Sequence, residues 1–451
     1  MTAFLRKYIG PREFYERTFR VALPLAMTLL LSSCMSIIDS IMVSSIGMVT
    51  AVGNASQFLT LHDGISWGIT SGIAIYAAQF FGARQYDNMT RTLGLSIVLT
   101  FTNALFWAIV AFLFADQILL FYLDDLDLLV HSRSYLNIAI LSTFPSALNM
   151  SFNVMYRSSQ NTKLPFIMSL IGGVGNVIFN SLFIYVMEIG VMGAALGTLV
   201  AQSFVTVCYI AYMVRTKPLF FKGFKKIFDL KPAFVKPIFM KAMPLIINET
   251  FFGFGSTLFV KAFGMLGTRN MDAYYVANQV FNMFTFAVHG YGGAVSVLIG
   301  SRLGEGRIEE AKEESNYQLG LGLILGVVLV AIMLAFKDLI LSLFSIADET
   351  TYQIAGGLLA VFSIKVFLRM FNYLMFSTLR AGGDAKIMNL LDSGIMYLVG
   401  IPLAFISVWI GITDIVLVLL ICQIEQLVRL VITMYRYKSG VWAKDLTKGL
   451  A

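Results

Sequence analysis

Charged residues are scarce in this chain. Only 13% of its 451 residues are Asp, Glu, Lys or Arg, against about a quarter in an average soluble protein. Hydrophobic residues make up 58%, and no polar stretch is long enough to form a separate soluble domain. The composition therefore predicts a protein that crosses a membrane several times, with the lipid bilayer as its surroundings.

The chain also lacks the motifs of cofactor chemistry. Its three cysteines, Cys34, Cys208 and Cys422, lie in separate apolar runs, too scattered for a disulfide framework or a metal site. There is no GxxxxGK[ST] loop for ATP and no HExxH zinc motif. We expect no cofactor. A membrane enzyme or a receptor would need a clustered catalytic set or a sensor domain, and neither is visible.

Long apolar runs dominate what is present. Each is long enough to cross about 30 Å of hydrocarbon as a helix, and none alternates with the two-residue period of a barrel strand. A spanning helix also satisfies its own backbone hydrogen bonds. The twelve expected spans are residues 17–47, 51–81, 90–114, 128–156, 163–187, 191–214, 238–267, 272–300, 313–336, 352–379, 387–410 and 413–437.

The basic residues fall on one side of these spans. Most of the 33 Lys and Arg residues lie in or beside the termini and the even-to-odd connections, whereas the opposite side holds only Arg133, Arg269 and Lys337. Such a bias predicts that both termini are cytoplasmic in an inner membrane protein. The net charge of +7 is then a topology signal and a contact with anionic lipid, and no nucleic-acid partner is expected.

The sequence repeats itself at offsets between 220 and 223 residues. An even number of spans per repeat gives both halves the same orientation, with a pseudo-twofold axis along the membrane normal. We expect an all-α membrane protein with twelve transmembrane helices in two six-helix lobes. The predicted lobes are residues 1–214 and 238–451, joined by a basic cytoplasmic linker, 215–237. The matched pairs are Pro24 and Pro244, Gln57 and Gln279, Gly82 and Gly304, Asn149 and Asn372, and Arg157 and Arg380.

One carboxylate, Asp39, lies deep in the first span, about four helical turns after Pro24. A charge at that depth costs several kcal/mol unless it is compensated, so an intramembrane Asp indicates a functional site. The alternative is a buried Asp that only caps or pairs with a neighbouring helix.

Several motifs together resemble the multidrug and toxic compound extrusion (MATE) family. They include the early Pro24 and the Arg157 turn, which is followed by LPF. The second half adds Glu249 and a terminal SGVW segment. The longer motifs are IDSIMVSSIG (38–47), AAQFFGA (77–83), GVMGAALGT (190–198), GSRLGEG (300–306) and LRAGGD (379–384).

This resemblance implies a twelve-helix, two-lobe antiporter and no enzyme. Such a protein exports amphipathic, often cationic, drugs or metabolites against a sodium or proton gradient by alternating access. We expect it to act as a monomer. The alternative in the same superfamily is a lipid-linked oligosaccharide flippase, which would need several cations in its cleft; Lys261, Lys365 and Arg369 are the available ones.

The resemblance also implies a coupling site in the first lobe, where Asp39, Asn176, Asn180 and Thr198 converge. Carboxylate, amide and hydroxyl oxygens suit a small hard cation. The family pattern has a carboxylate at position 180, so Asn180 leaves one charge where two are usual. A lone carboxyl in an apolar lobe favours its neutral form, which favours proton coupling over sodium. Sodium at Asp39 is the one metal that the pattern allows.

A second candidate site lies in the other half. Glu249, Lys365 and Arg369 form either a second coupling site or an internal salt bridge, and Arg369 stands where the NorM-like branch has a carboxylate. We expect Arg369 to pair with Glu249, doing without bound sodium. Glu425 and Arg429 have the i, i+4 spacing of a structural pair.

The remaining polar residues have weaker signals. Pro24 and Pro244 are expected to bend their helices. His62 and His289 are intramembrane residues that either relay protons or only pack through hydrogen bonds. The substrate-cleft candidates are the repeat-related polar residues Gln57, Gln279, Asn149 and Asn372.

Overall fold

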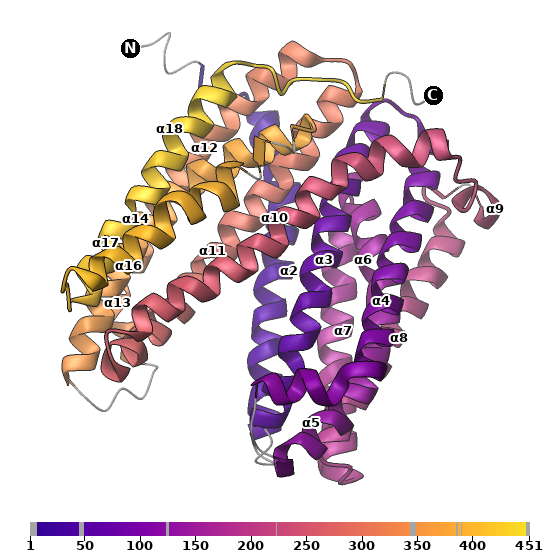
Figure 1. The fold of residues 1–451 in the computed structure, drawn as a ribbon. Helices are drawn as coiled ribbons and strands as arrows, with labels where there is room; N and C mark the ends of the chain where they lie inside the picture. The colour runs from indigo at the N-terminus through magenta and orange to yellow at the C-terminus, as the bar shows by residue number, and fades with distance from the viewer. Residues whose placement is uncertain are drawn as a thin grey trace. The chain divides into compact units, whose positions relative to one another are not determined.

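Helices joined by short turns make up the protein, shown as a ribbon in Figure 1. The computed structural model describes residues 7–44, 49–122, 126–221, 223–342, 349–384, 387–388 and 390–447. No strand occurs in these ranges. The first half contains α2 (Arg12–Ser44), α3 (Val49–Gly82), α4 (Tyr86–Tyr122), α5 (Leu126–Ala139), η1 (Ile140–Ser142), α6 (Thr143–Ser158), α7 (Lys163–Ser181), η2 (Leu182–Val186) and α8 (Val191–Thr216).

The short helix α9 (Phe224–Ile227) follows and leads into the second half. That half contains α10 (Pro232–Gly264), α11 (Thr268–Gly304), α12 (Ile308–Ala335), α13 (Lys337–Ser342), α14 (Glu349–Ala381), η3 (Leu390–Gly394), η4 (Met396–Gly400), α16 (Ile401–Trp409), α17 (Ile415–Cys422) and α18 (Ile424–Lys438).

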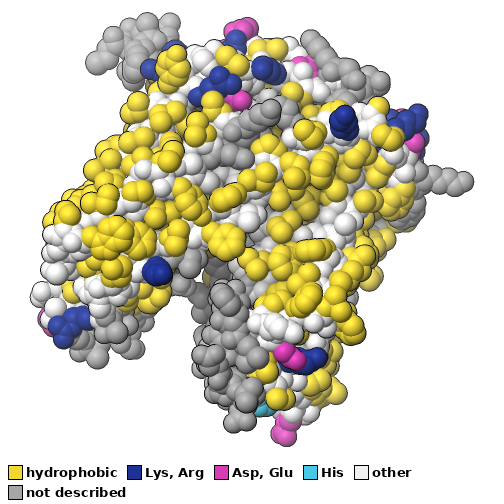
Figure 2. Space-filling view, viewed as in Figure 1, with side chains coloured by type: hydrophobic (Ala, Val, Ile, Leu, Met, Phe, Trp, Pro, Cys, Tyr) yellow, Lys and Arg dark blue, Asp and Glu magenta, His cyan; other side chains and the backbone are white. Residues whose placement is uncertain are grey.

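Ten stretches of the described chain are long and apolar enough to cross a membrane. They correspond to ten of the twelve predicted spans, and the first two predicted spans coincide with α2 and α3. Large apolar side chains such as Phe112, Val186 and Trp409 are exposed on the helix flanks, and Figure 2 shows apolar side chains over much of the visible face. Such exposure suits lipid. The protein is a multi-pass membrane protein with an all-α fold.

Several helices extend beyond the predicted spans. Helix α10 begins at Pro232, inside the stretch assigned to the linker, and α11 runs from Thr268 to Gly304. A helix can continue past the hydrocarbon because its first and last turns are satisfied by water, so apolar length underestimates helix length. The eleventh predicted span is built from η3, η4 and α16, and η3 and η4 are π-helical turns.

The described chain packs as two compact units. Unit 1 contains Met1–Ala26 and Ile247–Leu446, and unit 2 contains Met27–Ile246 and Thr447–Ala451. Two of the boundaries between the units lie inside helices. One follows Ala26 in α2, two residues after Pro24, and the other follows Ile246 in α10, two residues after Pro244. The predicted lobes follow the sequence repeat, and that division remains a prediction.

The start of each proline-containing helix is held by a glycine of its own unit. In unit 2, a Cβ atom at Gly68 of α3 would lie 2.6 Å from the Cα of Ile246. In unit 1, a Cβ atom at Gly290 of α11 would lie 2.5 Å from the Cα of Ala26. Only glycine permits backbones to approach this closely. Gly68 and Gly290 are 222 residues apart, so the repeat preserves this contact.

Candidate functional site

Four side chains of unit 2 form a continuous hydrogen-bonded row. Asn180 donates from Nδ2 to Oδ1 of Asp39 at 2.9 Å and to Oδ1 of Asn176 at 3.1 Å. Asn176 donates to Oγ1 of Thr198 at 3.1 Å, and Thr198 donates to the carbonyl of Ala194 at 3.1 Å. Helices α2, α7 and α8 therefore bring together the four residues that the sequence grouped.

Asn180 uses both of its amide hydrogens in this row, because an amide nitrogen has two to donate. Its other polar atom, Oδ1, is buried and has no hydrogen-bond partner among the described atoms. That oxygen lies against Gly197 of α8: a Cβ atom there would overlap it and lie 2.8 Å from the backbone nitrogen of Asn180. Because Gly197 has no side chain, the side chain of Asn180 can lie against α8 in this position.

The row borders a cavity of about 490 Å³ within unit 2. Asp39, Asn176 and Thr198 line this cavity, together with a second carboxylate, Asp63, and one cation, Arg157. The two carboxylates outnumber the single arginine, so the cavity favours a positively charged occupant. Its walls also carry Met35, Trp67, Met150, Met168 and Tyr209.

His62 is fully buried in α3 and engaged in packing contacts. Its Nδ1 lies 2.9 Å from Oδ1 of Asp63, its Nε2 lies 3.4 Å from the hydroxyl of Ser66, and its carbonyl accepts from Asn103 of α4 at 3.0 Å. These bonds fix α3 against α4 and hold Asp63 at the cavity.

Two of the predicted cleft residues, Asn149 and Asn372, join neighbouring helices through hydrogen bonds. Asn149 of α6 donates to the side chain of Gln202 at 2.8 Å and to its carbonyl at 3.0 Å. Asn372 of α14 makes the same two bonds to Gln426 of α18, at 3.2 and 3.1 Å. Asn149 also lines the unit 2 cavity.

The other two cleft candidates have different positions. Gln279 is exposed on α11 and is not among the residues lining the cavity of unit 1. The side chain of Gln57 on α3 lies outside the part of the structure that is described.

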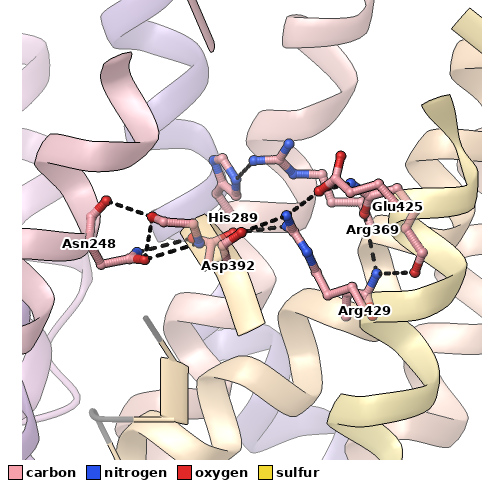
Figure 3. A network of polar contacts seen from close by, with 9 residues as sticks. Asn248, His289, Arg369, Asp392, Glu425 and Arg429 are labelled. Carbon is pink, nitrogen blue, oxygen red and sulfur yellow. Dashed lines mark hydrogen bonds and ion pairs between the residues drawn. The ribbon is translucent and has the colours of Figure 1, made fainter. Parts of the chain in front are cut away.

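Unit 1 contains a second polar network, shown in Figure 3. Arg429 of α18 lies between two carboxylates, 2.8 Å from Oδ1 of Asp392 and in direct contact with Glu425. Asn248 of α10 donates to Asp392 at 3.1 Å. The structure thus confirms the predicted pairing of Glu425 with Arg429 and adds Asp392 to it.

Arg369 of α14 does not pair with Glu249. Its Nη2 lies 3.2 Å from Nε2 of His289 on α11, as Figure 3 shows. Arginine can only donate, so Nε2 is the acceptor and the imidazole is neutral in this arrangement. Among the described residues, Glu249 makes no ion pair within 4 Å. The expected direct pair is therefore absent, because α14 packs along α11 and turns Arg369 toward it.

Lys365 lies one turn before Arg369 on α14. Its Nζ is 4.9 Å from the ring centre of Phe281 and 5.6 Å from that of Phe362. Both cations line a cavity of about 630 Å³ within unit 1. Lys261, the third cation considered from the sequence, is exposed on α10 and does not line this cavity.

Sequence reasoning missed three residues of these polar networks. Asp392 lies five residues after the start of the predicted eleventh span, and a carboxylate inside a predicted span was the available signal. Gln202 and Gln426 are the partners of the repeated asparagines, and their near-repeat spacing of 224 residues was the available signal. No group of three or more His, Cys, Asp or Glu suited to a metal occurs among the residues described.

Comparison with known proteins identifies the family and the fold of the chain. The MatE family model matches residues 24–182 and 244–406. "Probable multidrug resistance protein YoeA" of Bacillus subtilis (strain 168) is 23% identical over 414 residues, covering 86% of this chain and 88% of its own. "Multidrug and toxin extrusion protein 1" of Oryctolagus cuniculus is 24% identical over 372 residues, covering 81% of this chain and 64% of its own.

A solved structure shares the fold. It is described as the outward-facing conformation of a multidrug resistance MATE family transporter of the MOP superfamily, and it matches with a TM-score of 0.86 at 15% identity. The match covers 94% of this chain and 96% of the other. The fold of such transporters has twelve helices in two lobes.

Proposed function

Because the chain belongs to the MatE family, we propose that it is a secondary active exporter that releases amphipathic or cationic organic compounds in exchange for a coupling ion. The two relatives named above carry multidrug export in their names. No similarity found favours the lipid-linked oligosaccharide flippase. Relatives of this kind are transporters, which carry out no chemical conversion of their cargo.

The observation that carries the proposal is the row from Asp39 to Thr198. Its one carboxylate lies on a cavity wall in α2, the first predicted membrane span, and is held in place by Asn180. A carboxylate in this position is costly unless it has a function or a partner. No cation lies within 4 Å of Asp39 among the described side chains. Asp39 is therefore free to exchange its charge for a proton or a bound cation.

A proton is the better fit as coupling ion. Asn180 turns its Nδ2 toward both Asp39 and Asn176, whereas sodium would need several oxygens turned toward one point. A protonated Asp39 can still accept from Asn180 on one oxygen while it carries the proton on the other. Uptake of one proton would thus neutralise the cavity wall that holds a cationic substrate, and so favour substrate release.

The transport step would be alternating access in a monomer of the inner membrane, with both termini cytoplasmic. Pro24 and Pro244 lie two residues before the places where α2 and α10 pass from one unit to the other. A proline removes one helical hydrogen bond and creates a bending point. The two helices could then absorb a change of angle without breaking the packing inside either unit.

Transport of a fluorescent organic cation into proteoliposomes tests the proposal. Sodium and proton gradients are imposed separately on the natural chain and on Asp39→Asn. We expect proton-driven transport by the natural chain, and loss of gradient dependence in Asp39→Asn with an unchanged melting temperature.

Asp63→Asn is the matched control, because Asp63 lines the same cavity but bonds to His62 outside the row. It should weaken the apparent affinity for the cation and keep the gradient dependence. Full gradient-driven export by Asp39→Asn would exclude Asp39 from coupling.

A further inference from the structure

The cavity of unit 1 has the size and walls of a site for an organic molecule. Its volume of about 630 Å³ lies within the range of drug-sized ligand sites. Residues of α10, α11, α14, η4, α17 and α18 line it. Aromatic side chains form much of the wall: Phe252, Phe259, Phe263, Tyr274, Phe281 and Phe286.

Three cations line this cavity, and only one of them is neutralised by contact. Arg429 bonds to both Asp392 and Glu425, so its charge is fully offset. Lys365 and Arg369 share one face of α14 at i, i+4, where like charges repel. Within the described residues, neither has a carboxylate oxygen within 4 Å.

The contacts of Lys365 and Arg369 do not neutralise the positive charges of these two side chains. Arg369 bonds only to the neutral His289 among the described residues, so several of its five donor hydrogens have no acceptor there. The ammonium of Lys365 rests over the rings of Phe281 and Phe362. A cation–π contact partly compensates for lost hydration, but an ammonium also needs acceptors for three N–H groups.

The other charged groups nearby do not remove this excess. Glu249 is close enough to Arg369 and Arg380 to interact electrostatically, yet it does not line the cavity. The charged side chains that line the cavity are Lys365, Arg369, Arg429 and Glu425, so cations outnumber carboxylates on its wall. Lys365 and Arg369, which have no carboxylate contact among the described residues, both face the cavity.

We propose that this cavity binds an amphipathic anion, with its carboxylate, sulfonate or phosphate group between Lys365 and Arg369 and its apolar body against the aromatic wall. The anion supplies the acceptors that both cations lack, and charge-assisted hydrogen bonds of this kind are the stronger ones. The proposal extends the proposed export function, since the bound anion would be cargo. It adds a second class of substrate in a cavity whose charge is opposite to that around Asp39.

Equilibrium binding to the full chain in phosphatidylcholine nanodiscs tests the site without any ion gradient. Three probes share one aromatic body: pyrenebutanoate, pyrenebutanol and pyrenebutylamine. We expect pyrenebutanoate to bind at least about tenfold more tightly than the neutral alcohol, as a hydrogen bond to a charged group implies. Lys365→Met and Arg369→Met should each remove most of this preference, and Lys365→Arg should keep it.

Lys261→Met is the matched control, because Lys261 is an exposed cation of the same unit outside the cavity. It should leave all three affinities unchanged. Asp39→Asn should also keep the preference for the anion, so a failed coupling hypothesis and a failed anion site give different results. Equal binding of the three probes, or a preference that survives both Lys365→Met and Arg369→Met, would overturn the proposal.

The anion could be a soluble compound or the head group of a lipid. Nanodiscs that contain phosphatidylglycerol separate these sources. Pyrenebutanoate binding that is weaker in these nanodiscs than in phosphatidylcholine supports a lipid occupant. Unchanged binding supports a soluble one.

Discussion

The Nδ2 atom of Asn180 lies 2.9 Å from Oδ1 of Asp39, so the residue that replaces an expected carboxylate instead donates a hydrogen bond to the one that remains. The same nitrogen donates to Asn176. A carboxylate at position 180 could make neither bond in its ionised form. Ion selectivity in unit 2 is therefore expected to depend on this single side chain.

Asn180→Asp should shift export toward sodium. Two carboxylates at hydrogen-bond distance cannot both ionise without a cation or a shared proton. We expect sodium to stimulate transport in this variant and to have little effect on the natural chain, measured as initial rates at fixed pH. Asn176→Asp, in the same row but not bonded to Asp39, is the comparison. Sodium independence in Asn180→Asp would argue that position 180 has no part in ion choice.

Gly197→Ala should impair transport as much as Asn180→Ala. The new methyl group would occupy the space of Asn180 Oδ1 and displace the donor from Asp39. Gly175→Ala on α7 is the control, since its nearest atom would be 3.8 Å away. Equal transport by Gly197→Ala and Gly175→Ala would show that the position of Asn180 is not critical.

Arg429→Met should lower the stability of unit 1 by about 3–5 kcal/mol, because it leaves the buried Glu425 and the partly buried Asp392 without their cation. The melting temperature in detergent measures this. Combining it with Asp392→Asn and Glu425→Gln should restore much of the loss. A triple variant no more stable than Arg429→Met alone would mean that shape, and not charge, is what Arg429 contributes.

Gly68→Ala and Gly290→Ala should each cost about 1–3 kcal/mol by overpacking. The added methyl groups would press on the backbone of Ile246 and Ala26, which cannot move away as a side chain could. Gly64→Ala on α3 meets nothing within 4 Å and should be neutral or stabilising in the same melting assay. Equal melting temperatures for all three variants would contradict the close contacts.

Glu349→Cys should react with an impermeant maleimide from outside intact cells, and Glu309→Cys should not. Both positions are exposed, and the distribution of Lys and Arg puts them on opposite sides of the membrane. The three native cysteines are first replaced by Ala. External labelling of Glu309→Cys would reverse the predicted topology.

The helices and the repeat were predictable because bilayer thickness and backbone satisfaction allow few alternatives. The grouping of Asp39 with Asn176, Asn180 and Thr198 came from resemblance to a family, and the structure places these side chains in hydrogen-bond contact. Their role in coupling remains a prediction.

The partners of the charges in unit 1 were not predictable in the same way. Spacing along one helix identified Glu425 with Arg429, because both lie on α18. The partner of Arg369 depends on which helix α14 faces, and hydropathy carries no such information. Arg369 meets His289 of α11, while Glu249 on α10 remains apart from it. Asp392 lies in a π-helical turn, η3, and hydropathy does not show such an irregular place in a span.

The first segments of α2 and α10 each belong to the unit that is formed mainly by the other half of the chain. This arrangement affects how the protein can assemble from two fragments. A cut between α8 and α10 would yield two fragments, and each would begin with a segment that packs in the unit formed mainly by the other: Met1–Ala26 in unit 1 and the start of α10, up to Ile246, in unit 2. Neither fragment could complete its own core. Reconstitution would require both fragments to be present together, because each supplies a segment to the other's unit, as in a domain-swapped dimer. The yield of reconstituted protein should therefore rise with the product of the two fragment concentrations.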